Sequence, residues 1–296
     1  MLRRTIASIE CSSPTAYKNA AMRSQKMLES TIPIYAPIVY DPRRGRGFSI
    51  SSRNMNSSKP FENKVALVTG STRGIGRAIA RMLLLEGASV TICGRQPESV
   101  ARAVRELEAE TAGKVKGKHA DVRDYEQVRA MFEFVDREFG GLDFLVNNAG
   151  VGKFAKTSEL SVEDWHATLD TNLTGVFYCS RESLFRFGNR GGGYIVNISS
   201  LAGKNAFAGG AAYNASKFGL NGFSEALMLD ARYDGVRVST IMPGSVATEF
   251  GVGKVGSDWK IWPEDVAQIV RSLLEMPERT LISRVEVRPT RPNRST

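Results

Sequence analysis

Three polar residues in the second half of the chain have the types and spacing of an acid–base site. Ser200 supplies a hydroxyl, Tyr213 follows 13 positions later, and Lys217 stands four positions after the tyrosine. Residues at i and i+4 share one face of a helix, so the phenol and the ammonium group would lie together. A phenol has a pKa of about 10, and a fixed cation beside it favours the phenolate and lowers that pKa. An exposed Tyr/Lys pair on a surface helix is the simpler alternative for these two residues alone.

A glycine-rich turn is a second candidate site. Residues 69–76 read Thr-Gly-Ser-Thr-Arg-Gly-Ile-Gly, between the apolar run 65–68 and a segment with helical spacing. Glycines there let backbone N–H groups approach a pyrophosphate, which a helix N-terminus attracts. The spacing is G-x3-G-x-G, so the G-x-G-x-x-G dinucleotide fingerprint is not met. A purely structural turn is the alternative.

The end of the next apolar run bears on the choice of cofactor. A site that prefers NAD usually has a carboxylate there for the ribose 2′-hydroxyl. This chain has Cys93-Gly94-Arg95 instead. Arg95 and Arg73 could both approach a 2′-phosphate, so we expect NADP(H) rather than NAD(H). The alternative is that Arg95 is a solvated loop residue.

The elements that must position these residues alternate along the chain. Apolar runs indicate strands at 65–68, 89–93, 115–120, 144–146, 194–198, 236–241 and, as an edge strand, 285–287. Helical spacing covers 75–86, 98–112, 125–139, 162–187, 263–276 and a segment that contains Tyr213. This alternation predicts an α/β fold, a three-layer doubly wound parallel sheet of about seven strands with helices on both faces. Ligands of such sheets bind beyond the carboxyl ends of the strands, where these motifs fall.

Residues 1–60 differ in character from the rest. They hold ten Lys/Arg against three Asp/Glu, so most of the net charge of +9 lies there. We expect a basic, disordered extension; an organelle transit peptide, or a true start at Met55, are the alternatives. The protein is therefore expected in the cytoplasm, or in the mitochondrion or plastid if the extension is a transit peptide.

Several classes of function are disfavoured by composition. The folded part is nearly neutral, which argues against a nucleic-acid footprint on it. Three scattered cysteines without a CxxC pair, together with only two histidines, indicate neither a disulfide framework nor a metal site. No apolar run reaches the roughly 20 residues of a membrane span.

Together, these motifs resemble the short-chain dehydrogenase/reductase family over about residues 64–287. The resemblance rests on the glycine motif ending at Gly76, the turn Asn147-Asn148-Ala149-Gly150, the set Ser200, Tyr213 and Lys217, and Pro243-Gly244, which occur in the family's order. It implies that residues 61–296 form a single Rossmann-like oxidoreductase domain. The 3-oxoacyl-carrier-protein reductases look most similar.

The resemblance also implies roles for individual residues. Tyr213 would be the general acid in carbonyl reduction, and Lys217 would lower its pKa and bond the nicotinamide ribose. Ser200, rather than Ser199, would hydrogen-bond the substrate carbonyl. Asn172 would hold a water of the proton relay; a mid-helix asparagine satisfied by backbone is the alternative.

The cofactor contacts implied by the resemblance run along the whole chain. Asp121 and Val122 would meet the adenine, and Thr248 the carboxamide. The full predicted set is Gly70, Ser71, Arg73, Gly74, Ile75, Gly76, Arg95, Asp121, Val122, Asn148, Gly150, Tyr213, Lys217, Pro243, Gly244, Val246 and Thr248.

The expected function is an NADP(H)-dependent oxidoreductase that transfers a hydride between nicotinamide and a carbonyl or secondary alcohol, with a 3-oxoacyl thioester as one candidate substrate. A dinucleotide sensor or scaffold without turnover is the alternative, and a nucleic-acid-binding protein working through its basic tail is another.

Six apolar residues, Val151, Phe154, Phe207, Phe250, Trp259 and Trp262, would either form an apolar substrate pocket or simply pack in the fold. A basic patch for an acidic carrier protein, or simply a solvated face, would be formed by Arg181, Arg186, Arg190 and Lys204. The resemblance also implies a homodimer or homotetramer, packed through the helices that start near Val162 and Tyr213.

Overall fold

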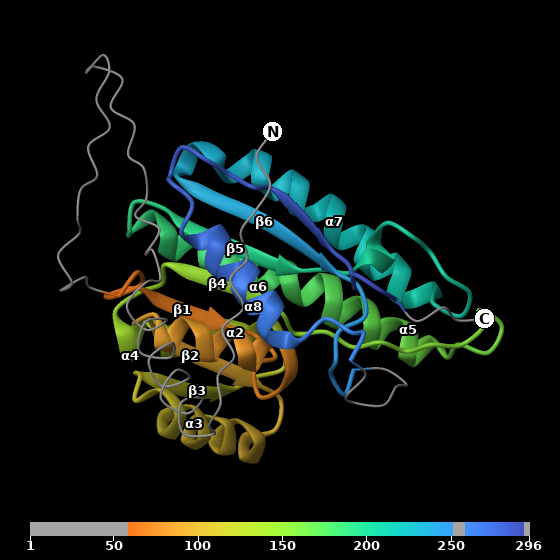
Figure 1. Ribbon diagram of the computed structural model, residues 1–296, viewed down its shortest axis with the longest axis horizontal. Helices are drawn as coiled ribbons and strands as arrows, with labels where there is room; N and C mark the ends of the chain where they lie inside the picture. The colour runs from red at the N-terminus through yellow and green to blue at the C-terminus, as the bar shows by residue number, and fades with distance from the viewer. Residues whose placement is uncertain (1–58, 251–257, 293–296) are drawn as a thin grey trace, which may run out of the picture. The chain divides into compact units, whose positions relative to one another are not determined.

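The computed structural model describes residues 59–250 and 258–292, which lie in one compact unit, Ser58–Thr296. The predicted extension 1–60 lies almost wholly outside the described residues. Seven strands form one sheet in the order β3-β2-β1-β4-β5-β6-β7 (Figure 1). The strands are β1 (Val65–Val68), β2 (Ser89–Gly94), β3 (Val115–His119), β4 (Phe144–Asn147), β5 (Gly193–Ile198), β6 (Val236–Pro243) and β7 (Arg284–Val287).

Every neighbouring pair of these strands runs parallel, so each connection must cross over the sheet. The crossovers contain the helices α2 (Gly74–Leu85), α3 (Pro97–Thr111), α4 (Tyr125–Phe139), α5 (Val162–Leu169), α6 (Gly175–Gly188), α7 (Ala211–Ala231) and α8 (Pro263–Leu274). The doubly wound parallel fold predicted from the alternating pattern is thereby confirmed.

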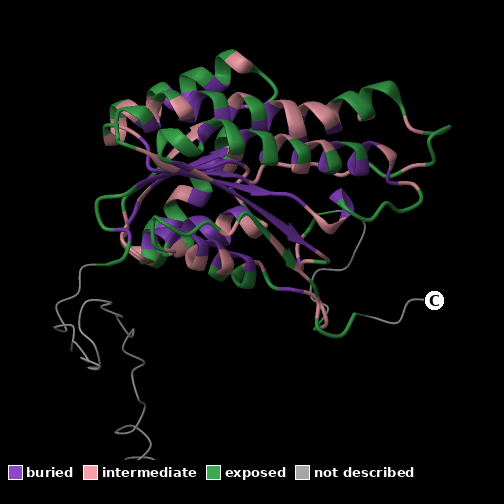
Figure 2. Ribbon diagram, turned by 90° about the horizontal axis from the view of Figure 1, so that it is seen from above, coloured by how far each residue is buried: buried purple, intermediate pink, exposed green. Residues whose placement is uncertain are grey.

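Alternate residues of the central strand face opposite layers of the core. Ala66 and Val68 of β1 pack into a cluster with α2, α3 and α8, whereas Val65 and Leu67 pack into a second cluster with α4, α6 and α7. This follows from the period of two along a strand. Figure 2 shows the buried residues concentrated in the sheet and on the helix faces turned toward it. Burial on both faces explains why β1 is apolar throughout.

The strand order places a crevice at the centre of the sheet. The chain winds from β1 outward through β2 to β3, then returns to the other side of β1 with β4. The connections that follow β1 and β4 therefore leave in opposite directions, and a ligand site is expected beyond their carboxyl ends.

The expected helix 162–187 is interrupted. Helix α5 ends at Leu169, a π-helical turn covers Asp170–Thr174, and α6 continues from Gly175. The Thr168 and Thr171 hydroxyls donate to the carbonyls of Asp164 and Ala167, each at 2.7 Å, in competition with the backbone ladder. Helical periodicity alone could not reveal a single widened turn.

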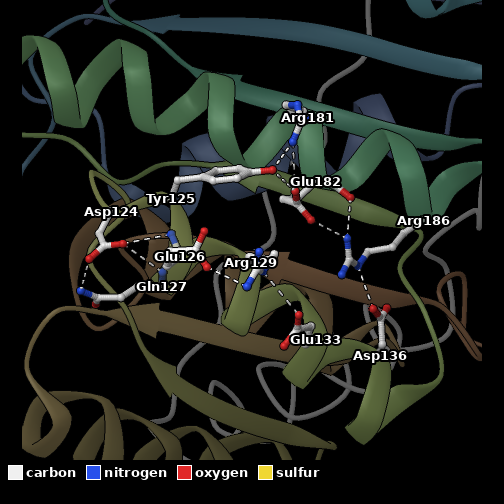
Figure 3. A network of polar contacts seen from close by, with 10 residues as sticks. All are labelled: Asp124, Tyr125, Glu126, Gln127, Arg129, Glu133, Asp136, Arg181, Glu182 and Arg186. Atoms are coloured by element: carbon white, nitrogen blue, oxygen red, sulfur yellow. Dashed lines mark hydrogen bonds and ion pairs between the residues drawn. The ribbon is translucent and has the colours of Figure 1, made fainter.

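A polar network ties α4 to α6 on the outer side of the second core cluster (Figure 3). The Glu182 carboxylate is buried, accepts the Tyr125 hydroxyl at 2.7 Å and pairs with Arg186 at 2.9 Å. Arg186 also pairs with Asp136 of α4 at 2.8 Å. These bonds satisfy a carboxylate that would otherwise be costly to bury.

Among the described residues, no helix combines the length and the apolar character needed to cross a membrane.

Candidate active site

A cavity of about 940 Å³ lies at the carboxyl ends of the strands, where the topology places the crevice. The turns after β1, β2, β3, β4, β5 and β6 all contribute to its lining. One end holds the glycine-rich turn, and the same lining includes Ser200, Tyr213 and Lys217. The structure therefore brings the two candidate sites of the sequence into one cavity.

Helix α7 presents Tyr213 and Lys217 from one face, as the i, i+4 spacing predicts. The Lys217 ammonium is buried, lies 5.8 Å from the centre of the Tyr213 ring and donates to the Ile198 carbonyl at 3.0 Å. The Ser200 hydroxyl lies close enough to the Tyr213 phenol to lower its pKa, accepts the Ala202 N–H at 3.1 Å and donates to the Pro243 carbonyl at 3.5 Å. Three groups able to donate to or hold a proton thus meet at this end of the cavity.

The pKa values of Tyr213 and Lys217 differ from those that the sequence predicts. Burial raises the pKa of Tyr213, and the hydrogen bond from Ser200, not Lys217, is what opposes that rise. Burial also lowers the pKa of Lys217 to about 8. The phenol pKa is therefore raised overall and not lowered as expected, because desolvation disfavours the phenolate, as it also disfavours the ammonium ion of Lys217.

Asn172 does not reach the cavity lining. Its side-chain amide accepts from the Val151 N–H at 2.8 Å and donates to the Val151 carbonyl at 2.9 Å and to the Ser216 hydroxyl at 3.0 Å. The alternative of an asparagine satisfied by backbone is thus the arrangement found, with the backbone supplied by the turn after β4. Asn172 holds Val151, which lines the cavity, against α7.

Two members of the glycine motif have structural positions rather than cavity positions. The Ser71 hydroxyl donates to the Val68 carbonyl at 2.5 Å and accepts the Cys93 N–H at 3.0 Å, which joins β1 to β2. A Cβ on Gly76 would lie 2.4 Å from Nδ2 of Asn148. Gly76 is therefore required for the close approach of α2 to the turn after β4.

The N-terminus of α2 opens into the cavity. Gly70 and Gly74 both have positive φ, at 62° and 57°, so the chain turns tightly and both residues line the cavity with Ile75. No side chain caps this helix, and its first turn holds no acidic residue. Its free N–H groups and positive end favour an anion.

Five arginines gather at this end of the cavity or beside it. Arg77 and Arg81 of α2 pair with carboxylates of α3, and exposed Arg73 pairs with Glu249 at 2.6 Å. Arg123 pairs with Asp121, whose pKa it lowers. Arg95 lines the cavity and forms no ion pair with another described residue, although its charge also lowers the pKa of Asp121. Arg95 is thus the arginine most open to an added anion.

The remaining predicted contacts follow the other strand ends. All of them line the cavity: Val122 after β3, Asn148 and Gly150 after β4, and Pro243, Gly244, Val246 and Thr248 at and after the end of β6. Asn148 donates to the carbonyls of Thr69 and Gly70 at 3.0 and 2.9 Å, which fixes the glycine turn. The sequence analysis did not identify two further lining residues, Arg77 and Arg81. They stand four positions apart on α2, the helix that begins at the glycine turn, and that spacing could have indicated them.

The apolar residues expected around a substrate divide into two groups. Val151, Phe154, Phe250 and Trp259 line the cavity, whereas Phe207 and Trp262 do not. Phe207 instead packs on Phe154, with ring centres 5.8 Å apart.

The basic residues considered for a carrier protein are all engaged. Arg181 and Arg186 pair with Glu182, Arg190 with Asp143, and Lys204 with Glu286. Among the described side chains, no group of three or more His, Cys, Asp or Glu residues could hold a metal ion.

Comparisons with known proteins agree with this geometry. A family profile described as "short chain dehydrogenase" matches residues 64–255. A 3alpha-hydroxysteroid dehydrogenase of Mediterraneibacter gnavus is 38% identical over 190 residues, which are 64% of this chain and 76% of that protein.

Solved structures of similar proteins include two with cofactor. An alcohol dehydrogenase of the archaeon Thermococcus sibiricus, complexed with 5-hydroxy-NADP, is 31% identical with a TM-score of 0.73 and covers 78% of this chain and 99% of its own. A single-residue variant of the actinorhodin polyketide ketoreductase with NADPH is 34% identical with a TM-score of 0.70, over 76% of this chain and 96% of its own.

Proposed function

Because this chain belongs to the short-chain dehydrogenase/reductase family, we propose that it reduces a ketone, or oxidises the matching secondary alcohol, with NADP(H). The observation that carries the proposal is the meeting of Ser200, Tyr213 and Lys217 in a cavity that also holds an uncapped helix N-terminus. One end of the cavity suits a pyrophosphate, and the other suits proton transfer to a carbonyl oxygen.

The residues present fit a dinucleotide. The turn Gly70–Ile75 would hold the pyrophosphate, Asp121 and Val122 the adenine, and Thr248 the nicotinamide carboxamide. A Cβ on Gly74 would lie 3.3 Å from Cγ2 of Thr248, so a side chain there would narrow this part of the cavity. Among the described residues, the buried Lys217 ammonium donates to the Ile198 carbonyl alone, which leaves protons for a ribose hydroxyl.

The choice of NADP(H) rests on charge. No carboxylate stands at the end of β2, and Arg95 there lacks an ion-pair partner among the described residues. A guanidinium group matches the geometry of a phosphate monoester. The cofactors bound to the two structural neighbours support the same choice.

The mechanism follows from the positions of three side chains. When bound, the reduced cofactor supplies a hydride to the carbonyl carbon. The Ser200 and Tyr213 hydroxyls donate to the carbonyl oxygen, where negative charge develops, and Tyr213 delivers its proton there. Lys217 places a positive charge beside the phenolate that remains. Val151, held by Asn172, forms part of the wall that keeps the carbonyl in place.

A 3-oxoacyl thioester remains one candidate within this class, supported by similarity to the ketoreductase. Delivery on an acidic carrier protein has less support, because Arg181, Arg186, Arg190 and Lys204 are already paired with carboxylates.

The test is turnover of a carbonyl panel by the purified chain, followed by loss of reduced-nicotinamide absorbance with NADPH and with NADH. We expect turnover with at least one ketone and a higher kcat/KM for NADPH. Tyr213→Phe should lower kcat by at least about 10³-fold, because the proton donor is gone, while the Kd for NADPH changes by less than about threefold.

A near-normal rate in Tyr213→Phe would refute the assigned acid. Preference for NADH would refute the cofactor choice. If the protein bound NADPH but reduced no ketone, the result would favour the alternative of a dinucleotide sensor or scaffold without turnover.

We also propose that the protein is a homo-oligomer and acts in the cytoplasm. Helices α5, α6 and α7 carry exposed apolar side chains, among them Val162, Phe185 and Leu229, which support association. Cys93 and Cys179 are buried free thiols, as suits a reducing compartment. Cell fractionation tests the location.

A further inference from the structure

Two phenylalanines border the catalytic phenol itself. The centre of the Tyr213 ring lies 5.6 Å from that of Phe154, edge to face, and 5.8 Å from that of Phe250, at a tilt of 48°. Both phenyl rings line the cavity. Tyr213 is only 9% exposed, but Phe154 and Phe250 remain 40% and 46% exposed. Each phenyl ring therefore packs against Tyr213 and still leaves a large part of its surface exposed.

Both rings also lie close to Gly152. A Cβ on Gly152 would lie 2.6 Å from Cζ of Phe154 and 3.1 Å from Cε1 of Phe250. These rings come from segments almost 100 residues apart, the turn after β4 and the turn after β6, so their approach is a tertiary feature. Val151 and Trp259 add further apolar side chains to the lining of the same cavity. We call Phe154 and Phe250 the phenyl pair.

The position of the phenyl pair limits the shape of what it can bind. The carbonyl oxygen must meet Tyr213, and the pair touches the ring of that same residue, so the apolar part of a substrate must begin next to its carbonyl carbon. Aromatic rings attract flat partners in edge-to-face and offset arrangements. A flexible acyl chain would lose conformational freedom there and gain no such contact.

We propose that the substrate is a flat, apolar ring ketone, with the carbonyl in the ring or directly attached to it, held by Phe154 and Phe250. This inference rests on the proposed function and names its substrate class. The phenyl pair selects such ketones over linear 3-oxoacyl thioesters and over small polar ketones. Burial of the open phenyl faces by the substrate supplies the preference.

The experiment compares kcat/KM with NADPH for four probes: 1-tetralone, 1-indanone, acetoacetyl-N-acetylcysteamine and hydroxyacetone. We expect the two ring ketones to exceed the thioester and hydroxyacetone by at least about tenfold. Phe154→Ala and Phe250→Ala should each lower kcat/KM for the ring ketones by about 10- to 100-fold, and by a larger factor than they lower it for hydroxyacetone, so that the ratio of the two falls.

Two further variants separate recognition from general damage. Gly152→Ala should displace the phenyl pair and reduce the preference for ring ketones without removing either ring. Tyr233→Ala, which removes an aromatic side chain that is 90% exposed and outside the cavity lining, should leave the preference unchanged. Circular dichroism and unfolding midpoints show whether each variant is folded.

The outcomes are distinct for the two proposals. Equal or better turnover of the thioester or hydroxyacetone, or an unchanged preference in Phe154→Ala and Phe250→Ala, would overturn the ring-ketone assignment and leave the reductase intact. If no probe is reduced, quenching of bound NADPH fluorescence by 1-tetralone still tests the phenyl pair. Quenching that is lost in Phe154→Ala would then support the ring-ketone site, although the proposed reductase activity would be rejected. No quenching in the unaltered protein would overturn the ring-ketone site as well.

Discussion

Burial controls the proton chemistry of Tyr213 and Lys217. It raises the pKa of the phenol and lowers that of the ammonium group to about 8, so both residues favour their neutral forms relative to water. For a carbonyl reductase this suits Tyr213, which must hold its proton until the oxygen becomes negative. Lys217 supplies its charge only while protonated.

The pH dependence of the reaction follows from these pKa values. Lys217 is charged below about pH 8 and neutral above it. We therefore expect kcat/KM for reduction to be highest below pH 8 and to fall as the pH rises through that value. Because kcat/KM reports groups of the free enzyme, a profile from pH 6 to 10 measures this pKa. Alcohol oxidation needs the phenolate and should instead increase with pH.

Lys217→Arg is the matched variant. A guanidinium stays charged throughout this range, so the falling limb should move to higher pH even if the maximal rate is lower. A falling limb that stays near pH 8 in Lys217→Arg would mean that another group is titrating.

The connections between elements decide which side chains reach the cavity. The π-helical turn Asp170–Thr174 places Asn172 against the backbone of Val151, and Asn148 holds the glycine turn across the crevice. Asn148 thereby links the turns after β1 and β4, whereas Asn172 links the turn after β4 to Ser216 of α7. At this scale the polar residues act by positioning the backbone.

The α4–α6 network should contribute to stability rather than to catalysis. Glu182 is buried with Arg186 and Tyr125, and none of the three lines the cavity (Figure 3). We expect Glu182→Ala to lower the free energy of unfolding by about 3 kcal/mol, because Arg186 then loses one of its two carboxylate partners in a largely buried position. Urea unfolding measures the change, and the KM for NADPH should stay the same.

Glu133→Ala is the control for this network. Glu133 lies on the same helix α4 and is exposed, and its ion pair with Arg129 is long, at 3.7 Å. Its replacement by alanine should therefore lower the free energy of unfolding by less than about 1 kcal/mol. Equal losses in the two variants would show that burial of Glu182 contributes nothing.

At the scale of the whole molecule, helices α5, α6 and α7 carry several exposed apolar side chains. Phe185 of α6 is 60% exposed and Leu229 of α7 is 52% exposed. We expect light scattering after gel filtration to give two or four times the chain mass of 32.4 kDa. Replacement of both residues by lysine should lower that mass, because charge at the centre of an apolar interface is costly.

Leu85→Lys is the matched control, since Leu85 is exposed on α2, on the opposite face of the sheet. The Leu85→Lys variant should give the same mass in light scattering, and so the same oligomer, as the unaltered protein. A single-chain mass for the unaltered protein would reject the oligomer.

Much of the fold could be predicted from local pattern. Apolar strands alternating with amphipathic helices imply a parallel sheet, and element boundaries mostly fell within one or two residues of those expected. The π-helical turn escaped prediction because threonine back-bonding changes one turn without changing the apolar period. The predicted site residues Ser71, Gly76 and Asn172 lie outside the cavity lining and contact the segments that form it, because the same residue types suit both close packing and ligand contact.

The chain order by itself determined the types of chemistry available: a phenol and an ammonium group on one helix face, a hydroxyl before them, and glycines ahead of a helix. Only the tertiary structure decided how these groups behave. Burial, which depends on every packed layer, sets the pKa of Lys217 and of Tyr213. The approach of Phe154 to Phe250 over Gly152 likewise arises from folding, because it joins the ends of two strands that are distant in sequence.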